Sequence, residues 1–238
     1  MAQNVMITGA GTAPGLGYNF VRRYLENGDR VIATIRRPSP DLDALLEQYG
    51  DQLSVVTMDI ADTASVEKAE KEIEALVPCI DVLINNAVMT TKYYPATIEE
   101  ADLDQIAEVF NVTAVGALRV TKAFFPLLYA SKMPAIVANI TSEAGSMGAC
   151  FRSDTMYEYC MSKAALNMGT LLLHNKYKED HRMNVICIQP GWMRTHLPSP
   201  APCDPYDNAE MMRLLIEKKR TDYDGPVFVT YEGEEYPW

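Results

Sequence analysis

The chain has 238 residues, 48% of them hydrophobic, and its 32 acidic against 21 basic side chains give a net charge of -11. This length fits one domain with a substantial core. The acidic balance excludes a general nucleic-acid binder, because phosphate contacts need a basic surface. No apolar run approaches the ~20 residues that a membrane-spanning helix needs, so we expect no membrane partner.

The five cysteines are scattered and form neither a CxxC pair nor a cluster with the three histidines. This usage predicts reduced thiols, no metal site and a cytoplasmic protein. The first residues lack the basic and apolar regions of a signal peptide, which fits the same expectation.

Short apolar runs alternate along the chain with amphipathic stretches. The runs are rich in Val and Ile, as expected of strands buried on both faces of a parallel sheet. They lie at residues 5–8, 31–35, 53–58, 82–84, 135–140, 184–189 and 227–230.

Helical patterns fill most of the intervals between these runs. The first spans residues 16–25 and ends at Asn27-Gly28, and a second begins at Asp62 or Thr63. Two helices are expected within 99–129, where Pro126 disturbs the second, and further helices at 157–177 and 208–219.

The alternation predicts an α/β fold, a single Rossmann-type domain over residues 1–238 with a doubly wound parallel sheet of about seven strands. The segment LPSPAPCDP breaks the rhythm before the last helix. We therefore expect a substrate loop or lid at about 194–215.

The stretch TGAGTAPGLG, residues 8–17, joins the first predicted strand to the first predicted helix. Such a loop offers backbone N–H groups and a helix N-terminus to a pyrophosphate. It departs from the GxGxxG fingerprint, because Pro14 stands where the third glycine is expected. Alone, it is weak evidence of nucleotide binding.

The second predicted strand ends in Arg36-Arg37. An acidic residue at this point would bind the ribose hydroxyls of NAD, whereas a guanidinium attracts the 2′-phosphate of NADP. NADP(H) is therefore favoured, and NAD(H) remains the alternative.

Tyr159 and Lys163 form a YxxxK pattern on the predicted helix 157–177. Their i, i+4 spacing puts both side chains on one face, where the ammonium would favour the phenolate. The pattern is common and arises mostly by chance, and the alternative interpretation is a surface Tyr beside a surface Lys. The surrounding segments are more specific: Ser142 follows a buried strand 17 residues before Tyr159, Asn111 stands in FNVTAVGAL, and QPGWMRT covers 189–195.

In this order, these segments resemble the short-chain dehydrogenase/reductase family over the whole chain. The loop is similar to the TGxxxGxG form of that family with two extra residues, so that Thr12 and Ala13 are expected to bulge outward. Asp59-Ile60 resembles the adenine-contacting pair, and Asn85-Asn86-Ala87-Val88 resembles NNAG with Val88 in place of Gly. YCMSKAALN, QPGWMRT and the final YEGEEYPW are most similar to the carbonyl-reductase-like subgroup.

The resemblance implies an NAD(P)-dependent oxidoreductase that uses NADPH to reduce an aldehyde or ketone by hydride transfer. Tyr159 would donate the proton, Ser142 would bind the carbonyl oxygen, Lys163 would contact the nicotinamide ribose, and Asn111 would hold a relay water. The implied cofactor residues are Gly9, Gly11, Thr12, Gly15, Leu16, Gly17, Arg36, Arg37, Asp59, Ile60, Asn86, Ala87, Val88, Tyr159, Lys163, Pro190, Gly191, Met193 and Thr195.

Three other functions remain open. They are an NAD-linked alcohol dehydrogenase, a reductase of C=C or C=N bonds or an isomerase on the same fold, and a non-catalytic NADP-binding sensor or scaffold. The intact Asn, Ser, Tyr and Lys argue against the last of these. The expected partner is a small-molecule carbonyl or alcohol, and a homodimer or homotetramer through residues 100–130 and 157–177 remains open.

Substrate contacts are expected from two segments beside the catalytic residues. They contain Glu143, Met147, Phe151, Arg152, Met156, His196 and Leu197.

Overall fold

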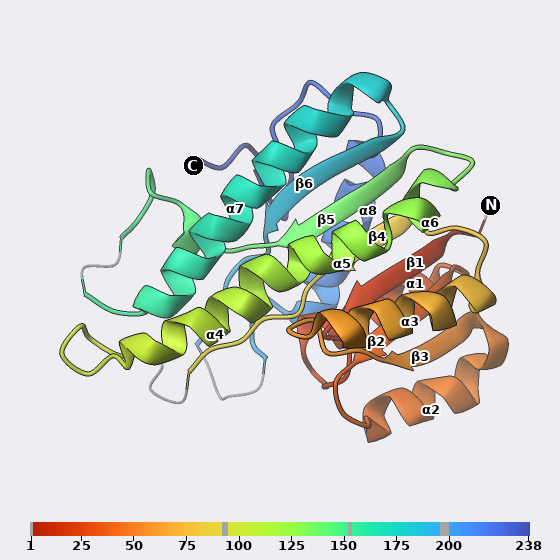
Figure 1. The fold of residues 1–238 in the computed structure, drawn as a ribbon, viewed down its shortest axis with the longest axis horizontal. Helices are drawn as coiled ribbons and strands as arrows, with labels where there is room; N and C mark the ends of the chain where they lie inside the picture. Colours follow the sequence, from red (N-terminus) through yellow and green to blue (C-terminus); the bar gives the residue numbers. More distant parts are fainter. Residues whose placement is uncertain (1, 92–94, 152–153, 196–199) are drawn as a thin grey trace.

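A single sheet of seven parallel strands runs through the molecule in the order β3-β2-β1-β4-β5-β6-β7 (Figure 1). The computed structural model describes residues 2–91, 95–151, 154–195 and 200–238. Every expected run is a strand, and the predicted Rossmann-type architecture is confirmed. The strands are β1 (Asn4–Thr8), β2 (Arg30–Ile35), β3 (Leu53–Thr57), β4 (Val82–Asn85), β5 (Ala135–Ile140), β6 (Met183–Gln189) and β7 (Phe228–Thr230).

Helices cover both faces of the sheet (Figure 1). They are α1 (Leu16–Glu26), α2 (Pro40–Tyr49), α3 (Thr63–Leu76), α4 (Ile106–Phe110), α5 (Ala117–Ala123), α6 (Phe125–Tyr129), α7 (Tyr157–Tyr177) and α8 (Pro205–Lys219). Among the described residues, no helix is long and apolar enough to cross a bilayer.

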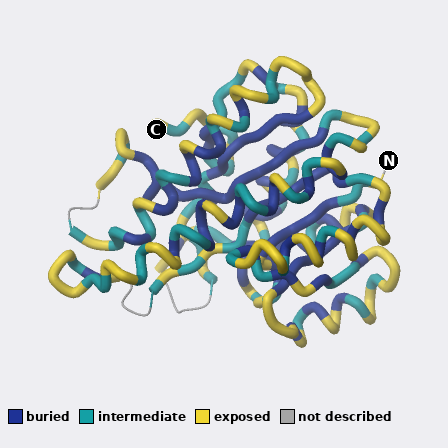
Figure 2. The backbone as a smooth tube through the Cα atoms, viewed as in Figure 1, coloured by how far each residue is buried: buried dark blue, intermediate teal, exposed yellow. Residues whose placement is uncertain are grey.

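The two faces of the sheet bury separate cores, which Figure 2 shows as the dark interior. Val5 and Ile7 of β1 point into a core shared with α1, α2 and α8, whereas Met6 between them points into a core shared with α3, α5 and α6. This period of two along a strand buried on both sides explains the continuous apolar runs in the sequence.

The order in which the strands follow one another across the sheet reverses between β1 and β4, which lie side by side and parallel. From β1 the strands proceed through β2 to β3, and the chain then returns to place β4 against the other side of β1. Ile7 consequently lies opposite Ala33 of β2 and Ile84 of β4. In parallel α/β sheets the crevice beyond the carboxyl ends of the strands at this reversal is where ligands bind.

Helix α2 is an element that the sequence analysis did not identify. Ser39 caps it by accepting a hydrogen bond from the Leu42 N–H, and Pro40 occupies its first turn. The helix buries Leu42 and Leu45 against the sheet. The Ser-Pro start and the i, i+3, i+4, i+7 spacing of Leu42, Leu45, Leu46 and Tyr49 were both usable signals.

The stretch expected to hold two helices contains three short α-helices, with a π-helical turn over Asn111–Gly116 between α4 and α5. A π-turn adds residues to one turn and rotates every later side chain relative to an α-helix. The break at Phe124 lies just before Pro126, as expected of a proline in the first turn of α6.

The predicted lid at 194–215 is only partly a loop. Asp204 caps α8 through the Tyr206 N–H, and the helix begins at Pro205, three residues before the expected start at 208. Residues such as Met212 are fully buried in the core beside α1. Of the predicted segment, the structure describes 194–195 and 200–204 as loop, and residues 196–199 lie outside the described ranges.

Candidate active site

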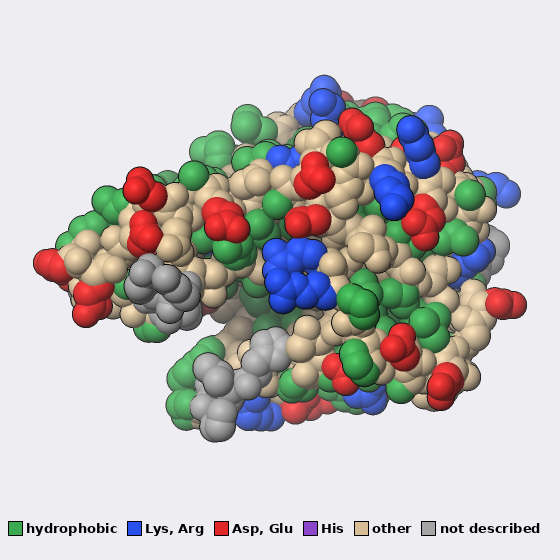
Figure 3. All heavy atoms as spheres, turned by 60° about the horizontal axis from the view of Figure 1, so that its bottom comes forward, with side chains coloured by type: hydrophobic (Ala, Val, Ile, Leu, Met, Phe, Trp, Pro, Cys, Tyr) green, Lys and Arg blue, Asp and Glu red, His purple; other side chains and the backbone are tan. Residues whose placement is uncertain are grey.

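A cleft of about 690 Å³ opens at the carboxyl ends of the central strands. On the face that Figure 3 presents, the surface is hollowed and Lys and Arg side chains gather beside the hollow. The cleft also takes in Thr34, Ile35, Pro38, Met58, Met89 and Val112, which the motifs did not single out. The predicted cofactor residues that line it are Gly9, Gly11, Thr12, Gly15, Leu16, Gly17, Arg36, Arg37, Asp59, Ile60, Asn86, Ala87, Val88, Met193 and Thr195.

The glycine loop is tied to the end of β4 by side chains on both sides. The Thr8 hydroxyl accepts from the N–H groups of Asn86 (3.0 Å) and Ala87 (3.1 Å). In return, the Asn86 side-chain amide donates to the carbonyls of Thr8 (3.0 Å) and Gly9 (3.1 Å). The two strand ends that border the cleft are thereby fixed relative to each other.

Two glycines of the loop cannot be replaced without displacing this contact. Gly9 has a φ of +67°, and a Cβ there would lie 2.7 Å from the Cα of Ala87. A Cβ on Gly17 would lie 2.5 Å from both the Asn86 Nδ2 and the Gly9 oxygen. The loop therefore keeps its bare backbone close to the cleft, as binding a pyrophosphate requires.

The two extra loop residues lie beside the start of α1, where the Thr12 carbonyl accepts from the Gly15 N–H at 2.8 Å. Thr12 is exposed, and the Ala13 N–H donates to Asp41 of α2 at 3.0 Å. The N-cap residue of α1 is Gly15, which has no side chain to occupy the first N–H groups of the helix. These groups can serve an anion in the cleft.

The end of β2 supplies the basic side chains of the cleft. Arg36 and Arg37 follow Ile35 directly, and both are exposed on the lining. Across from them, Asp59 uses one carboxylate oxygen to accept from the Ala61 N–H at 2.9 Å. The arginines are thus available to a phosphate, while Asp59 shapes the turn after β3.

Ser142 lies just beyond β5 and is nearly buried, with 5% of its surface exposed. Its hydroxyl donates to Glu143 Oε2 at 2.7 Å and accepts from the Ala144 N–H at 3.1 Å. The neighbouring Thr141 donates to the Asn167 side chain of α7 at 2.6 Å, which holds this segment against the helix.

Lys163 projects from α7 into the interior, where 2% of it is exposed. Its ammonium donates to the Ile140 carbonyl at 2.7 Å and lies 5.7 Å from the centre of the Tyr159 ring. Burial lowers the pKa of Lys163 from 10.5 to about 7, and the nearby Glu143 carboxylate partly opposes this by favouring the ammonium. Lys163 therefore lies between the end of β5, two residues before Ser142, and the Tyr159 ring of α7.

The side chain of Asn111, the residue expected to hold a relay water, makes its hydrogen bonds to neighbouring protein groups. Its amide donates to the Ala61 carbonyl at 3.0 Å, and its side-chain oxygen accepts from Arg119 at 2.9 Å. Both groups are thus directed toward the loop after β3. Asn111 is the first residue of the π-helical turn, which changes the phase of the helix and which motif spacing could not reveal. Two residues later, the buried Thr113 hydroxyl accepts from the Met89 N–H at 3.4 Å.

The segment after β6 turns sharply toward the cleft. Gly191 has a φ of +84°, and Asn208 of α8 donates to the Pro190 carbonyl at 2.8 Å. Met193 and Thr195 reach the cleft lining, whereas Pro190 and Gly191 form the turn behind it.

The loop after Ser142 offers apolar surface to the solvent beside the site. Met147 is 80% exposed and Phe151 is 71% exposed. Arg152, His196 and Leu197, which were expected to contact the substrate, lie outside the described residues. Within the described ranges, no group of three or more His, Cys, Asp or Glu side chains is placed to hold a metal ion.

Comparison with known proteins classifies the chain. A family model described as short chain dehydrogenase matches residues 3–202. The C-signal protein of Myxococcus xanthus is 33% identical over 160 residues, which cover 67% of this chain and 93% of that protein. The short chain dehydrogenase gsfK of Penicillium aethiopicum is 28% identical over 256 residues and is matched over the full length of both chains.

Solved structures resemble the fold over its whole length. The NADPH-bound carbonyl reductase from chicken fatty liver has a TM-score of 0.88 at 26% identity, covering 100% of this chain and 99% of that one. The carbonyl reductase Sniffer of D. melanogaster has a TM-score of 0.90 at 25% identity, with both chains fully covered. The chain therefore belongs to the short-chain dehydrogenase family of NAD(P)-dependent oxidoreductases.

Proposed function

We propose that this protein reduces an aldehyde or ketone to an alcohol with NADPH as hydride donor. The observation that carries the proposal is the combination of two features at one edge of the sheet. A cleft is lined by the glycine loop and by Arg36 and Arg37. Ser142, Tyr159 and the buried Lys163 gather at the end of β5 on the same edge.

The cleft residues suit an extended dinucleotide. The backbone of the glycine loop and the start of α1 would hold the pyrophosphate. Arg36 and Arg37 would bind the 2′-phosphate through charge-assisted hydrogen bonds, while Asp59 and Ile60 would border the adenine. Val88, Met193 and Thr195 would lie toward the nicotinamide, which supplies the hydride when the cofactor is bound.

Side chains of the protein would stabilise the negative charge that develops on the carbonyl oxygen. Ser142 and Tyr159 would hold that oxygen, and Tyr159 would donate the proton as hydride arrives at the carbon. Lys163 would stabilise the phenolate left on Tyr159 and contact the ribose. In the oxidative direction Tyr159 would take the proton back.

Relatives lend support to the choice of NADPH. The chicken carbonyl reductase is described as NADPH-bound. The NADP-dependent 3-hydroxy acid dehydrogenase YdfG of Salmonella typhi is 32% identical over 142 residues, which cover 60% of this chain and 55% of that protein.

The proposal is tested by titrating the protein with NADPH and with NADH and then screening aldehydes, ketones, enones and imines with the tighter cofactor. We expect tight NADPH binding and turnover of at least one aldehyde or ketone. NADPH binding without turnover of any carbonyl would instead indicate a sensor, and turnover confined to enones or imines would indicate a C=C or C=N reductase. Binding of neither cofactor would refute the proposal.

A further inference from the structure

Glu143 places a carboxylate on the hydroxyl of the proposed catalytic serine. The Ser142 Oγ and Glu143 Oε2 are 2.7 Å apart. An ionised carboxylate can only accept a hydrogen bond, so the proton between these atoms belongs to Ser142.

In its second hydrogen bond the Ser142 hydroxyl is the acceptor. The Ala144 N–H donates to the same Oγ at 3.1 Å. A hydroxyl has one proton and two lone pairs. Within the described residues, these two bonds use the proton and one lone pair, so Ser142 offers a ligand an acceptor and no donor.

This polarity conflicts with the binding of a carbonyl group. A carbonyl oxygen can only accept, and in the proposed reaction Ser142 has to donate to it. An alcohol oxygen has a proton of its own and can donate to the remaining lone pair of Ser142.

Glu143 also acts electrostatically on Lys163. The carboxylate acts on the buried Lys163 ammonium and stabilises its charged form. Glu143 belongs to the 3₁₀ turn Glu143–Gly145, which packs so closely on α7 that a Cβ on Gly145 would lie 2.8 Å from the backbone of Lys163. The backbone of this turn is therefore held against α7 at Lys163, and the Glu143 carboxylate bonds Ser142.

We propose that Glu143 is a positioning residue that fixes the hydrogen-bond direction of Ser142. With Glu143 ionised, the site binds hydroxyl-bearing ligands in preference to carbonyl ligands, and a carbonyl binds fully only by displacing the Ser142–Glu143 hydrogen bond. The inference rests on the proposed function, because it concerns the ligand oxygen at that site.

The experiment compares two ligands of nearly the same shape, 4-nitrobenzaldehyde and 4-nitrobenzyl alcohol. The aldehyde is measured with enzyme and NADP⁺, and the alcohol with enzyme and NADPH, because neither mixture can react. Glu143→Ala removes the acceptor, and Glu143→Gln keeps the size while its amide can donate to Ser142 and release the serine proton.

Both variants should bind the aldehyde about 3- to 10-fold more tightly, the effect of one additional hydrogen bond. Alcohol affinity should change little, because a hydroxyl can donate or accept. The ratio of the two dissociation constants is therefore the readout, and a merely structural defect would weaken both ligands together.

A double-mutant cycle identifies the residue through which Glu143 acts. In a Ser142→Ala background, Glu143→Ala should no longer change the ratio. Glu179→Ala is the matched control, since Glu179 is an exposed glutamate in the 3₁₀ turn Lys178–Asp180 at the other end of α7.

The inference is overturned if the ratio is unchanged in both Glu143 variants, or if it shifts equally without Ser142. Failure of the proposed function is distinguished by the unmodified enzyme. If that enzyme binds no NADP(H), or reduces no aldehyde or ketone, the proposed function and this inference fall together. If it turns over a carbonyl while the ratio stays constant, the inference alone fails.

Discussion

Lys163 is a cation in surroundings that penalise its charge. Its pKa of about 7 lies below the ordinary 10.5 chiefly because it is buried. The ammonium is thus present below about pH 7 and lost above it, whereas an unfolded chain would keep the proton up to about pH 10.5. Because the unfolded state binds more protons between these values, the Lys163 contribution to the free energy of unfolding rises with pH across that window.

We predict that carbonyl reduction falls as the pH rises through about 7, since the neutral lysine no longer stabilises the Tyr159 phenolate. A pH profile of kcat/KM tests this, because it reports groups of the free enzyme. Glu143→Gln should move the step to lower pH by removing the charge that favours the ammonium. A profile that is flat from pH 6 to 8, or a step unmoved in Glu143→Gln, would contradict the assignment.

Tyr159 is the residue on which the proposed proton transfer depends. Tyr159→Phe should lower kcat for carbonyl reduction by about 10²- to 10⁴-fold, the usual contribution of a general acid. The Kd for NADPH should stay within about two-fold, since the ring is retained. Tyr157→Phe serves as control, because the Tyr157 hydroxyl bonds Asp154 at 2.7 Å. Full activity of Tyr159→Phe would remove the residue from the mechanism.

The end of β2 is the element that we expect to select the cofactor. Replacing both Arg36 and Arg37 by Ala should weaken NADPH by roughly 10- to 100-fold, because charge-assisted hydrogen bonds to the 2′-phosphate are lost. NADH lacks that phosphate, so its Kd should be unchanged. Fluorescence titration of both cofactors measures the difference, and equal loss for NADPH and NADH would show that the arginines do not read the phosphate.

A buried chain of polar side chains joins β4, β5 and α7 behind the proposed catalytic residues. Asn85 donates to the Asn139 side-chain oxygen at 2.8 Å, and Asn139 donates to the Thr170 hydroxyl at 2.8 Å. This chain fixes the two strands that deliver the cleft and the serine against the helix that carries Tyr159 and Lys163.

Asn139→Leu should destabilise the protein by about 1–3 kcal/mol, because it leaves the buried amide of Asn85 without one of its acceptors. Urea unfolding measures the loss. Asn175→Leu, at an exposed position of α7, is the matched control. A loss no larger than that of the control would mean that the network does not stabilise the fold.

Elements were predictable from sequence where one physical signal dominated. Strands buried on both faces appear as uninterrupted Val and Ile runs, so all seven were located to within about two residues. Helix α2 was missed although its Ser-Pro start and its apolar residues at helical spacing mark it. Asn111 was placed by motif spacing, and the π-helical turn that begins at this residue depends on packing that a single sequence does not display.

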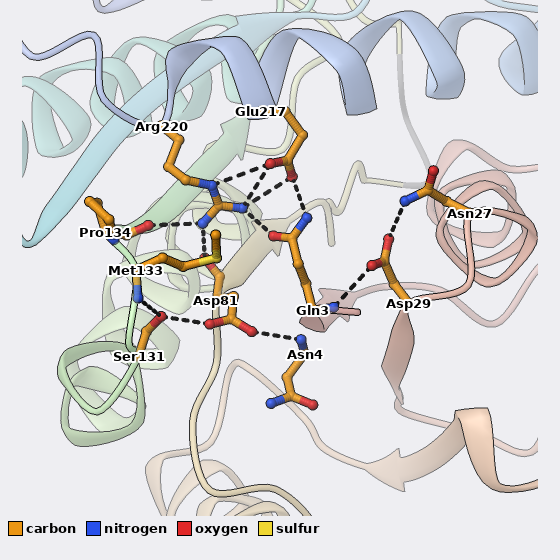
Figure 4. A network of polar contacts seen from close by, with 10 residues as sticks. All are labelled: Gln3, Asn4, Asn27, Asp29, Asp81, Ser131, Met133, Pro134, Glu217 and Arg220. Atoms are coloured by element: carbon orange, nitrogen blue, oxygen red, sulfur yellow. Dashed lines mark hydrogen bonds and ion pairs between the residues drawn. The ribbon is translucent and has the colours of Figure 1, made fainter. Parts of the chain in front are cut away.

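At the scale of the whole molecule, the two edges of the sheet have different roles. The carboxyl ends of the strands carry the cleft, and a polar network closes the opposite edge (Figure 4). There Arg220, beyond the end of α8, donates to the carbonyls of Asp81 (3.0 Å) and Pro134 (2.8 Å) and pairs with Glu217. It also contacts the Gln3 side chain just before β1.

Arg220→Met should cost about 1–3 kcal/mol of stability, because it leaves the buried carbonyls of Asp81 and Pro134 without their donor. The Kd for NADPH of the folded variant should be unchanged, since the network lies at the far edge from the cleft. Urea unfolding and cofactor titration test the two halves separately, with exposed Lys218→Met as control. An unchanged urea midpoint together with weakened NADPH binding would contradict both expectations.

The sequence predicted the overall architecture and most residues of the cleft lining. It did not predict the direction of the hydrogen bonds within the site. The order of motifs predicts which loops meet at the end of a parallel sheet, because topology brings them together. It does not predict that Ser142 donates to Glu143, since that depends on side-chain rotamers within one turn. The length of the loop before α8 likewise depends on where that helix begins, which the sequence placed three residues too late.

The most direct test of the central claim is the catalytic efficiency of the purified protein with 4-nitrobenzaldehyde, measured in parallel with NADPH and NADH. We predict formation of the alcohol with one NADPH consumed per product, and a kcat/KM with NADPH at least ~10-fold above that with NADH, in keeping with the arginines at the end of β2. Equal or better turnover with NADH, or NADPH binding with no reduction of this or any other carbonyl, would contradict the assignment of an NADPH-dependent carbonyl reductase.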